Sequence, residues 1–231
     1  MSDLLNSLPT MVMAIGGLGA AAYALVDASK ALPGGGPSMF GFDSIQGLVG
    51  KILPVGAIGS MPAYELVLET LRSNWINGMP SGDQKNVARS MLKLYLRAEN
   101  APDIAALLCL KPDDVSAVAR LWREGPSSQP GTDPSAAVVG RVDLALTAYV
   151  DGAYQRADQR YRNRCKLLAG VAAIVMSTVS GAALFHADAN AAGMIFMSFI
   201  AGLIAVPLAP VTKDLASALQ AGVKVAQSLR R

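Results

Sequence analysis

Two uncharged apolar stretches near the C-terminus, Leu167–Phe185 and Met194–Pro210, most constrain what this chain can fold into. They are separated by one short polar loop, His186–Gly193. Each stretch has about the length that an α-helix needs to cross roughly 30 Å of hydrocarbon. A third apolar stretch, Leu4–Val26, lies at the other end of the sequence. The sequence therefore predicts an all-α integral membrane protein with about three transmembrane helices.

Charge is concentrated in the middle of the chain. Only 16% of the 231 residues are charged, whereas a soluble domain carries about 25%. The two ends account for the deficit, and the centre has the composition of an ordinary soluble domain. The net charge of +3 is too small to indicate nucleic-acid binding. The two cysteines, Cys109 and Cys165, form no CxxC pair, which fits two unreactive thiols in a reducing cytosol.

Composition and turn residues divide the chain into seven segments. The first apolar stretch follows no positively charged region, so we expect a retained span rather than a cleaved signal peptide. The predicted segments are transmembrane helix 1 (1–32), a Gly/Pro-rich loop with a short helix (33–59), a small cytoplasmic helical domain (60–125), a flexible linker (126–135), a basic juxtamembrane helix (136–166), a transmembrane hairpin (167–210) and an amphipathic C-terminal helix (211–231).

Capping patterns and prolines predict where helices begin in the middle of the chain. Asp43 with Gln46, and Ser81 with Gln84, have the spacing of capping boxes. The helix opened by Asp43 is too short to span a membrane, and it fits either the membrane interface or a place against the soluble domain. Further helices are expected from Ser60 to Trp75, from Pro102, and from Pro112 to about Gly125.

A long helix is expected from Ser135 onward. Its first half carries one apolar stripe, formed by Val138, Val142, Leu146, Tyr149 and Ala153. Nothing in the sequence breaks this helix before Phe185, and a continuous helix of that length would extend about 75 Å. Two prolines, Pro207 and Pro210, are expected to end the third span before the amphipathic tail.

A run of basic residues precedes the second span: Arg156, Arg160, Arg162, Arg164 and Lys166. The loop after that span has no lysine or arginine, whereas four follow the third span. The positive-inside rule then places the middle domain and the C-terminus in the cytoplasm and the N-terminus outside, in the cell inner membrane. The basic run, with Tyr154 and Tyr161 interleaved, suits anionic lipid headgroups. A topology determinant that rests on headgroups is sufficient to explain it, and the alternative is a specific site for a lipid or another phosphate-rich ligand.

Small residues recur every four positions at both ends of the chain. One series is Gly16, Ala20 and Ala24, and the other is Ala218, Gly222 and Ala226. This spacing allows helix backbones to approach closely, so these residues are candidates for helix packing and homo-oligomerisation. The alternatives are lipid-facing composition for the first series and, for the second, a membrane-surface helix or packing against the long helix.

The segment Asp103–Val115 resembles the helix-turn-helix unit of sigma-like and response-regulator proteins over about twenty residues. It departs from that pattern in two respects. Cys109 occupies the turn position at which glycine is usual, and the second helix opens with Asp113 and Asp114, which repel phosphates. Nucleic acid is therefore a disfavoured partner.

Motifs for catalysis, metal ligation and cofactor binding are absent from the sequence. The spans contain no charged residue, which disfavours a proton- or ion-coupled transporter. They do contain hydroxyl residues that could line a pore: Ser177, Thr178, Ser180 and Ser198.

These features predict a non-enzymatic membrane anchor or scaffold subunit without a cofactor. It would self-associate and present its cytoplasmic helical domain to a cytosolic protein partner that the sequence does not identify. The alternative is a homo-oligomeric channel or pore-forming protein, and a membrane-tethered regulator that uses the helix-turn-helix-like segment comes third.

Overall fold

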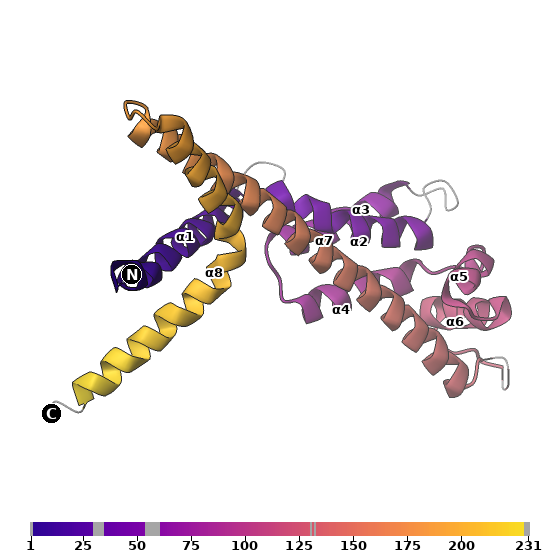
Figure 1. Cartoon of the computed structure of the whole chain (residues 1–231). Coiled ribbons are helices and arrows are strands. Elements are labelled where there is room, and N and C mark those ends of the chain that lie inside the picture. The colour runs from indigo at the N-terminus through magenta and orange to yellow at the C-terminus, as the bar shows by residue number, and fades with distance from the viewer. Residues whose placement is uncertain (1, 30–34, 54–60, 130, 132, 229–231) are drawn as a thin grey trace. The chain divides into compact units, whose positions relative to one another are not determined.

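A computed structural model describes residues 2–29, 35–53, 61–129, 131 and 133–228, with the side chains of 2–9, 61–63 and 211–228 outside this description. Every regular element in this part of the chain is helical, which confirms the all-α class (Figure 1). The elements are α1 (Ser2–Ala28), the 3₁₀ turn η2 (Gly36–Ser38), α2 (Met39–Ile52), α3 (Met61–Ile76), α4 (Ser81–Tyr95), α5 (Ala101–Leu108), α6 (Pro112–Glu124), α7 (Ala136–Phe185) and α8 (Ala191–Ser228).

Three of these helices are long and apolar enough to cross a membrane, as predicted. They are α1 from Thr10 to Ala28, α7, and α8 from Ala191 to Pro210. The chain forms two compact units. Unit 1 comprises residues 1–37 and 162–231, and unit 2 comprises residues 38–161, so α7 contributes its first half to unit 2 and its second half to unit 1.

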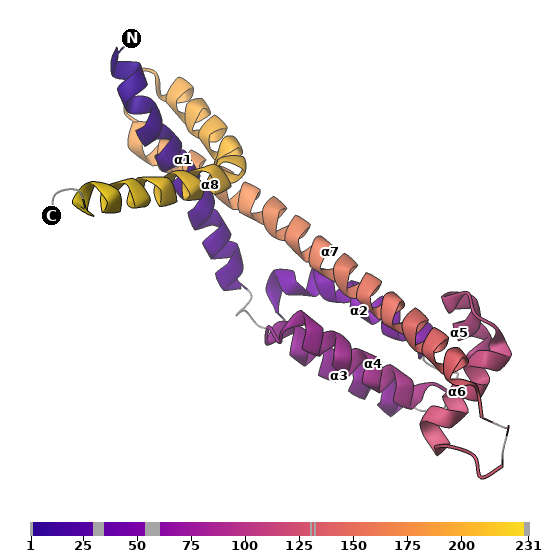
Figure 2. The same ribbon diagram turned by 90° about the horizontal axis from the view of Figure 1, so that it is seen from below.

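Unit 2 is a helical domain with one apolar core. Each of its six helices contributes buried side chains, among them Ile45 from α2, Leu71 from α3, Leu92 from α4, Ile104 from α5, Val118 from α6 and Leu146 from α7. Figure 2 shows α3 and α4 running side by side in this unit. The unit extends beyond the predicted domain 60–125 at both ends, because α2 and the first half of α7 supply much of its core.

Helix α2 packs within unit 2. Ile45, Val49 and Ile52 are completely buried on its inner face, which answers the question left open by the sequence: the helix is a core element of the domain. The predicted start at Asp43 is wrong, because α2 begins at Met39 after Ser38. Phe42 is 2% exposed and belongs to the core, so the burial of this earlier turn extends the helix toward the N-terminus.

A turn connects α3 and α4, and Gly78 has a φ of 69° within it. Helix α4 begins at Ser81, as predicted, but the capping box expected there is wrong. Pro80 is the N-cap residue of α4, and no side chain caps the helix. Instead the Gln84 side chain is buried, and its Nε2 donates a hydrogen bond to the Met79 carbonyl at 2.6 Å.

Two proline-initiated helices follow, as expected. Pro102 and Pro112 lie in the first turns of α5 and α6, where a missing N–H costs nothing. Cys109 ends α5 in the left-handed conformation, with a φ of 55°. Gly125 ends α6 with a φ of 81°, a conformation that glycine adopts at little cost.

Helix α7 is continuous over 50 residues, as the sequence predicted. Its predicted stripe is also confirmed: Val142, Leu146 and Ala153 are buried, and Val138 and Tyr149 pack against the same core.

The third candidate span ends at Pro210, as predicted, but the expectation that Pro207 and Pro210 end the helix is wrong. Helix α8 continues through Pro207 and Pro210 to Ser228, although each proline removes one backbone hydrogen bond and bends rather than ends a helix that packing supports. Figure 2 shows that α8 bends along its length.

Candidate functional site

Unit 1 has small residues inside and large apolar residues outside. The buried centre of its helix contacts is formed by Ala22 and Val26 of α1, Ala169 and Ala173 of α7, and Ala205 of α8. Large apolar side chains on the same helices are exposed, among them Leu167, Val171, Val175 and Val179 on α7 and Phe196, Met197 and Leu203 on α8. This arrangement is the reverse of a water-soluble core and is typical of helices surrounded by lipid.

The contact between α1 and α8 depends on Gly19. A Cβ atom at this position would lie 2.1 Å from the Ala205 carbonyl oxygen and 2.6 Å from its carbon. The two backbones are therefore in direct contact, and only glycine fits. Of the predicted series, Gly16 is buried, but Ala20 and Ala24 are exposed. The intramolecular contact thus uses the stripe of Gly19, Ala22 and Val26, which lies to one side of the predicted stripe.

The contact between α7 and α8 depends on two further glycines. A Cβ atom on Gly202 would overlap Ser177 Oγ, its nearest neighbour, and would lie 2.7 Å from Ile174 Cα. A Cβ atom on Gly181 would overlap the side chain of Ser198, 2.5 Å from its Cβ. Each close approach places a serine against a glycine across the helix pair.

These contacts account for two of the four hydroxyl residues assigned to a pore. Ser177 donates to the Ile174 carbonyl at 3.1 Å, and Ser198 donates to the Met194 carbonyl at 3.0 Å. Both hydroxyls are satisfied within their own helices, at positions packed against glycine. Ser180 is exposed, and Thr178 Oγ1 is buried without a hydrogen-bond partner in the structure. The pore assignment remains a prediction.

The basic run on α7 is exposed at all five predicted positions, Arg156, Arg160, Arg162, Arg164 and Lys166. In unit 1 the run divides between two sides of the helix. Arg164 precedes the exposed Leu167 and Val171 by three and seven residues, a spacing that places the three on one side. Arg162 and Lys166 precede the buried Ala169 and Ala173 by seven residues each and lie on the opposite side.

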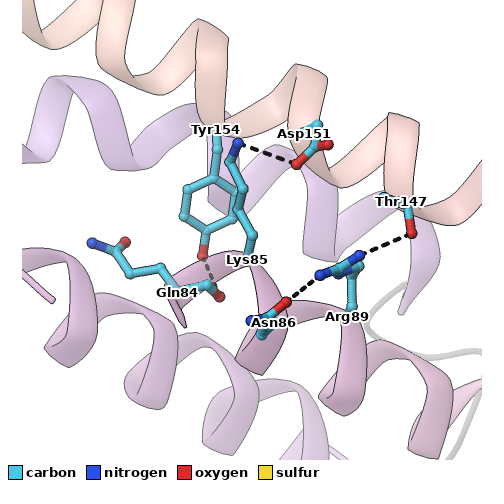
Figure 3. A network of polar contacts seen from close by, with 7 residues as sticks. All are labelled: Gln84, Lys85, Asn86, Arg89, Thr147, Asp151 and Tyr154. Carbon is cyan, nitrogen blue, oxygen red and sulfur yellow. Dashed lines mark hydrogen bonds and ion pairs between the residues drawn. The ribbon is translucent and has the colours of Figure 1, made fainter. Parts of the chain in front are cut away.

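A ladder of three polar pairs joins α4 to α7 in unit 2, and Figure 3 shows the two that involve Lys85 and Arg89. Lys85 pairs with Asp151 at 3.2 Å, Arg89 donates to Thr147 at 3.2 Å, and Lys93 pairs with Asp143 at 2.5 Å. From one pair to the next, the residue number rises by four on α4 and falls by four on α7. This is the register of two antiparallel helices. Each half-exposed ion pair contributes little by itself, about 0–1 kcal/mol. The ladder therefore fixes register more than it adds stability.

Aromatic residues fix α7 against α2 and α3 beyond this ladder. The rings of Tyr154 and Tyr161 each meet Trp75 edge-on at 6.5 Å, and the Trp75 indole donates to the Ser38 carbonyl at 2.9 Å. The Tyr154 hydroxyl faces the Gln84 carbonyl at 3.4 Å (Figure 3). Burial raises the pKa of the Tyr154 phenol, which keeps this hydroxyl protonated as a donor.

A pocket of about 340 Å³ in unit 2 is lined by Arg97, Arg120 and Arg123 together with Asp113 and Glu124. Arg123 already pairs with Glu124 at 2.5 Å, so the pocket has mixed charge. Among the side chains described, no three of His, Cys, Asp and Glu lie close enough together to hold a metal ion.

The segment that resembles a helix-turn-helix forms α5, the turn at Cys109, and α6. Cys109 adopts the left-handed conformation that glycine usually takes in such turns, and its side chain is exposed. Asp113 is exposed at the start of α6, where a carboxylate is favoured by the helix dipole and disfavours a phosphate backbone.

Sequence reasoning missed the glycines of closest approach and the α4–α7 ladder. Gly19 lies beside the residues that were selected, and only the fold shows which side of α1 meets α8. The ladder had a readable signal, because Lys85, Arg89 and Lys93 recur every four residues, as do Asp143, Thr147 and Asp151. Which helix would pair with which could not be read from either series alone. The side chains of Ala218, Gly222 and Ala226 lie outside the described residues.

Comparisons of the chain with protein-family models, with curated proteins and with solved structures found no match.

Proposed function

We propose that this chain is a non-enzymatic integral membrane protein whose three long helices anchor a small helical domain, which it presents to a cytosolic protein partner. The observation that carries this proposal is the packing of unit 1, with alanine and glycine inside and leucine, valine, methionine and phenylalanine outside. In water, such a surface would cost about 25 cal/mol for each Å² of exposed apolar area. In the hydrocarbon of a membrane the same surface carries no such cost, because the surrounding lipid chains are equally apolar. Close packing at the glycine contacts then holds the helices together.

The proposed topology places unit 2 and the C-terminus in the cytoplasm, with the turn between α7 and α8 on the outer side of the inner membrane. Its support is the basic run before the apolar half of α7 and the absence of lysine and arginine from residues 186–193. Cys109 and Asp188 are suitable reporters for the two sides, because both are exposed and they lie in different units.

Labelling with a membrane-impermeant maleimide tests this topology. In a Cys165→Ser chain, Cys109 is expected to stay unlabelled in intact cells and to react in inside-out vesicles. A Cys109→Ser, Cys165→Ser, Asp188→Cys chain is expected to show the opposite pattern. Labelling of both reporters from one side, or recovery of the chain in the soluble fraction after carbonate extraction, would contradict the proposal.

Self-association is the second part of the proposed function, and it is supported by the outer side of α1. On this side, one series of exposed positions, spaced alternately by three and four residues, carries only small side chains. The series is Ala14, Gly17, Ala21, Ala24 and Ala28. Large apolar residues are also exposed on α1, at Met11, Met13 and Leu25, but none of them belongs to this series, whereas the exposed faces of α7 and α8 carry mainly large side chains. Because small residues mark helix contacts in membranes, we propose that α1 of a second copy covers this face.

Native mass spectrometry of the intact chain released from nanodiscs is expected to show a dimer or a larger closed assembly. The variant Ala21→Leu with Ala24→Leu should shift it to monomer, because the added side chains hold the backbones apart. A matched pair on the exposed side of α7, Val175→Leu with Val179→Leu, should leave the mass unchanged. A monomeric wild-type chain would refute self-association and leave the anchor untouched.

The channel hypothesis gains no comparable support, since Ser177 and Ser198 are packed against glycines within the chain.

A further inference from the structure

The outer side of α7 in unit 1 changes abruptly from polar to apolar. Asn163 and Arg164 are exposed at its start, and Leu167 and Val171 are exposed on the same side, at 58% and 53%. The positions 163, 164, 167 and 171 recur at helical spacing, so the four side chains form one continuous strip. No charged residue follows on α7 after Lys166.

The spacing of this strip matches the headgroup and the first acyl-chain methylenes of one phospholipid molecule. Arg164 lies about 4.5 Å along the helix axis before Leu167, at 1.5 Å per residue. The headgroup layer on each side of the hydrocarbon is roughly 5–8 Å thick. If Leu167 begins the hydrocarbon contact, the Arg164 guanidinium lies at the depth of the lipid phosphate. Leu167 and Val171 then lie beside the first methylenes of an acyl chain.

We propose that Asn163, Arg164, Leu167 and Val171 form a binding site for one anionic phospholipid, such as phosphatidylglycerol. This inference rests on the proposed membrane anchoring and adds the class of lipid and the residues that select it. The guanidinium donates to phosphate oxygens, for which its planar fork is well suited, and the Asn163 amide can donate to the glycerol headgroup. A net negative lipid is selected over a zwitterionic one, because no carboxylate on this strip binds a choline group.

The opposite side of the helix offers a control of equal charge. Arg162 lies two residues from Arg164 and is also exposed, but it is on the side of the buried Ala169. A diffuse electrostatic attraction to the membrane would depend equally on the two arginines, since both lie within one Debye length, about 8–10 Å, of the boundary. A site on the outer strip depends on Arg164 alone.

The test begins with flotation of the full chain on liposomes, which checks membrane insertion independently. The same protein in detergent is then titrated with phosphatidylglycerol or phosphatidylcholine, and native mass spectrometry measures the apparent Kd for the first bound lipid. We expect tighter binding of phosphatidylglycerol, weakened roughly fivefold by Arg164→Gln, because one cation near the surface contributes about 1 kcal/mol. Arg162→Gln should change this Kd less than twofold, within about 0.4 kcal/mol.

Equal effects of Arg162→Gln and Arg164→Gln would overturn the site in favour of a diffuse field. Equal binding of the two lipids by the wild-type chain would overturn its selectivity for anionic lipid. A wild-type chain that does not float with liposomes would instead refute the membrane anchoring. Restored phosphatidylglycerol binding in Arg164→Lys, which keeps the charge without the planar fork, would support the charge as the selecting feature.

Discussion

Replacing Gly41 by leucine is expected to lower the free energy of unfolding of unit 2 by about 3 kcal/mol. Gly41 is buried where α2 crosses α7, and a Cβ atom there would lie 2.7 Å from the Ala157 carbonyl oxygen and 2.7 Å from the Trp75 ring. The backbone oxygen cannot rotate away. The added side chain must therefore separate α2 from α7 or displace Trp75, which loses contacts in the aromatic cluster with Tyr154 and Tyr161.

The matched control is Gly47→Leu, on the same helix. Gly47 is exposed, and a Cβ atom there would meet nothing within 4 Å. Because leucine has a higher helix propensity than glycine, this variant should gain about 0.5–1 kcal/mol. Both tryptophans of the chain, Trp75 and Trp122, lie in unit 2, so denaturant unfolding followed by tryptophan fluorescence reports on this unit. Equal midpoints for the two variants would show that α2 does not approach α7 closely at Gly41.

Local sequence patterns predicted the helices of this chain better than their ends. The apolar stripes fixed which segments are helical, because burial of Val142 or Leu71 contributes more free energy than a cap does. For the same reason the capping patterns at Asp43 and Ser81 failed. Burial of Phe42 in the core extends α2 toward the N-terminus, beyond Asp43. The Gln84 side chain donates a hydrogen bond to the Met79 carbonyl and does not accept one from a backbone N–H at the start of α4.

Pairing between helices could not be predicted from a single series of residues. More than one set of residues on α1 satisfies the small-residue spacing, because this helix is rich in small residues on several sides. The spacing fits Gly16 with Ala20 and Ala24 as well as it fits Gly16 with Gly19. Only the position of α8 distinguishes its inner side from its outer side. The prolines of α8 show a related effect: packing against neighbouring helices supports a helix that propensity alone would end at Pro207.

Replacing Gly19 by alanine is expected to open the helix contacts of unit 1. The new methyl group would lie 2.1 Å from the Ala205 carbonyl oxygen, and both atoms belong to rigid helices, so α1 and α8 must move apart. We expect a cost of about 1–3 kcal/mol from this overlap. The lost association is not replaced by a hydrophobic gain, because lipid chains are as apolar as the helix surface that becomes exposed.

Cys165 provides the measurement, since it is partly buried against the same cluster as Ala22 and Ala169. In a Cys109→Ser background it is the only thiol, and its rate of maleimide labelling in detergent reports how often unit 1 opens. A loss of about 1–3 kcal/mol should raise this rate roughly 5–150-fold. Gly17→Ala is the control on the same helix, because a Cβ atom there meets nothing within 4 Å and the outer side stays small. If the two alanine variants label at the same rate, the backbone contact between α1 and α8 does not hold this unit together.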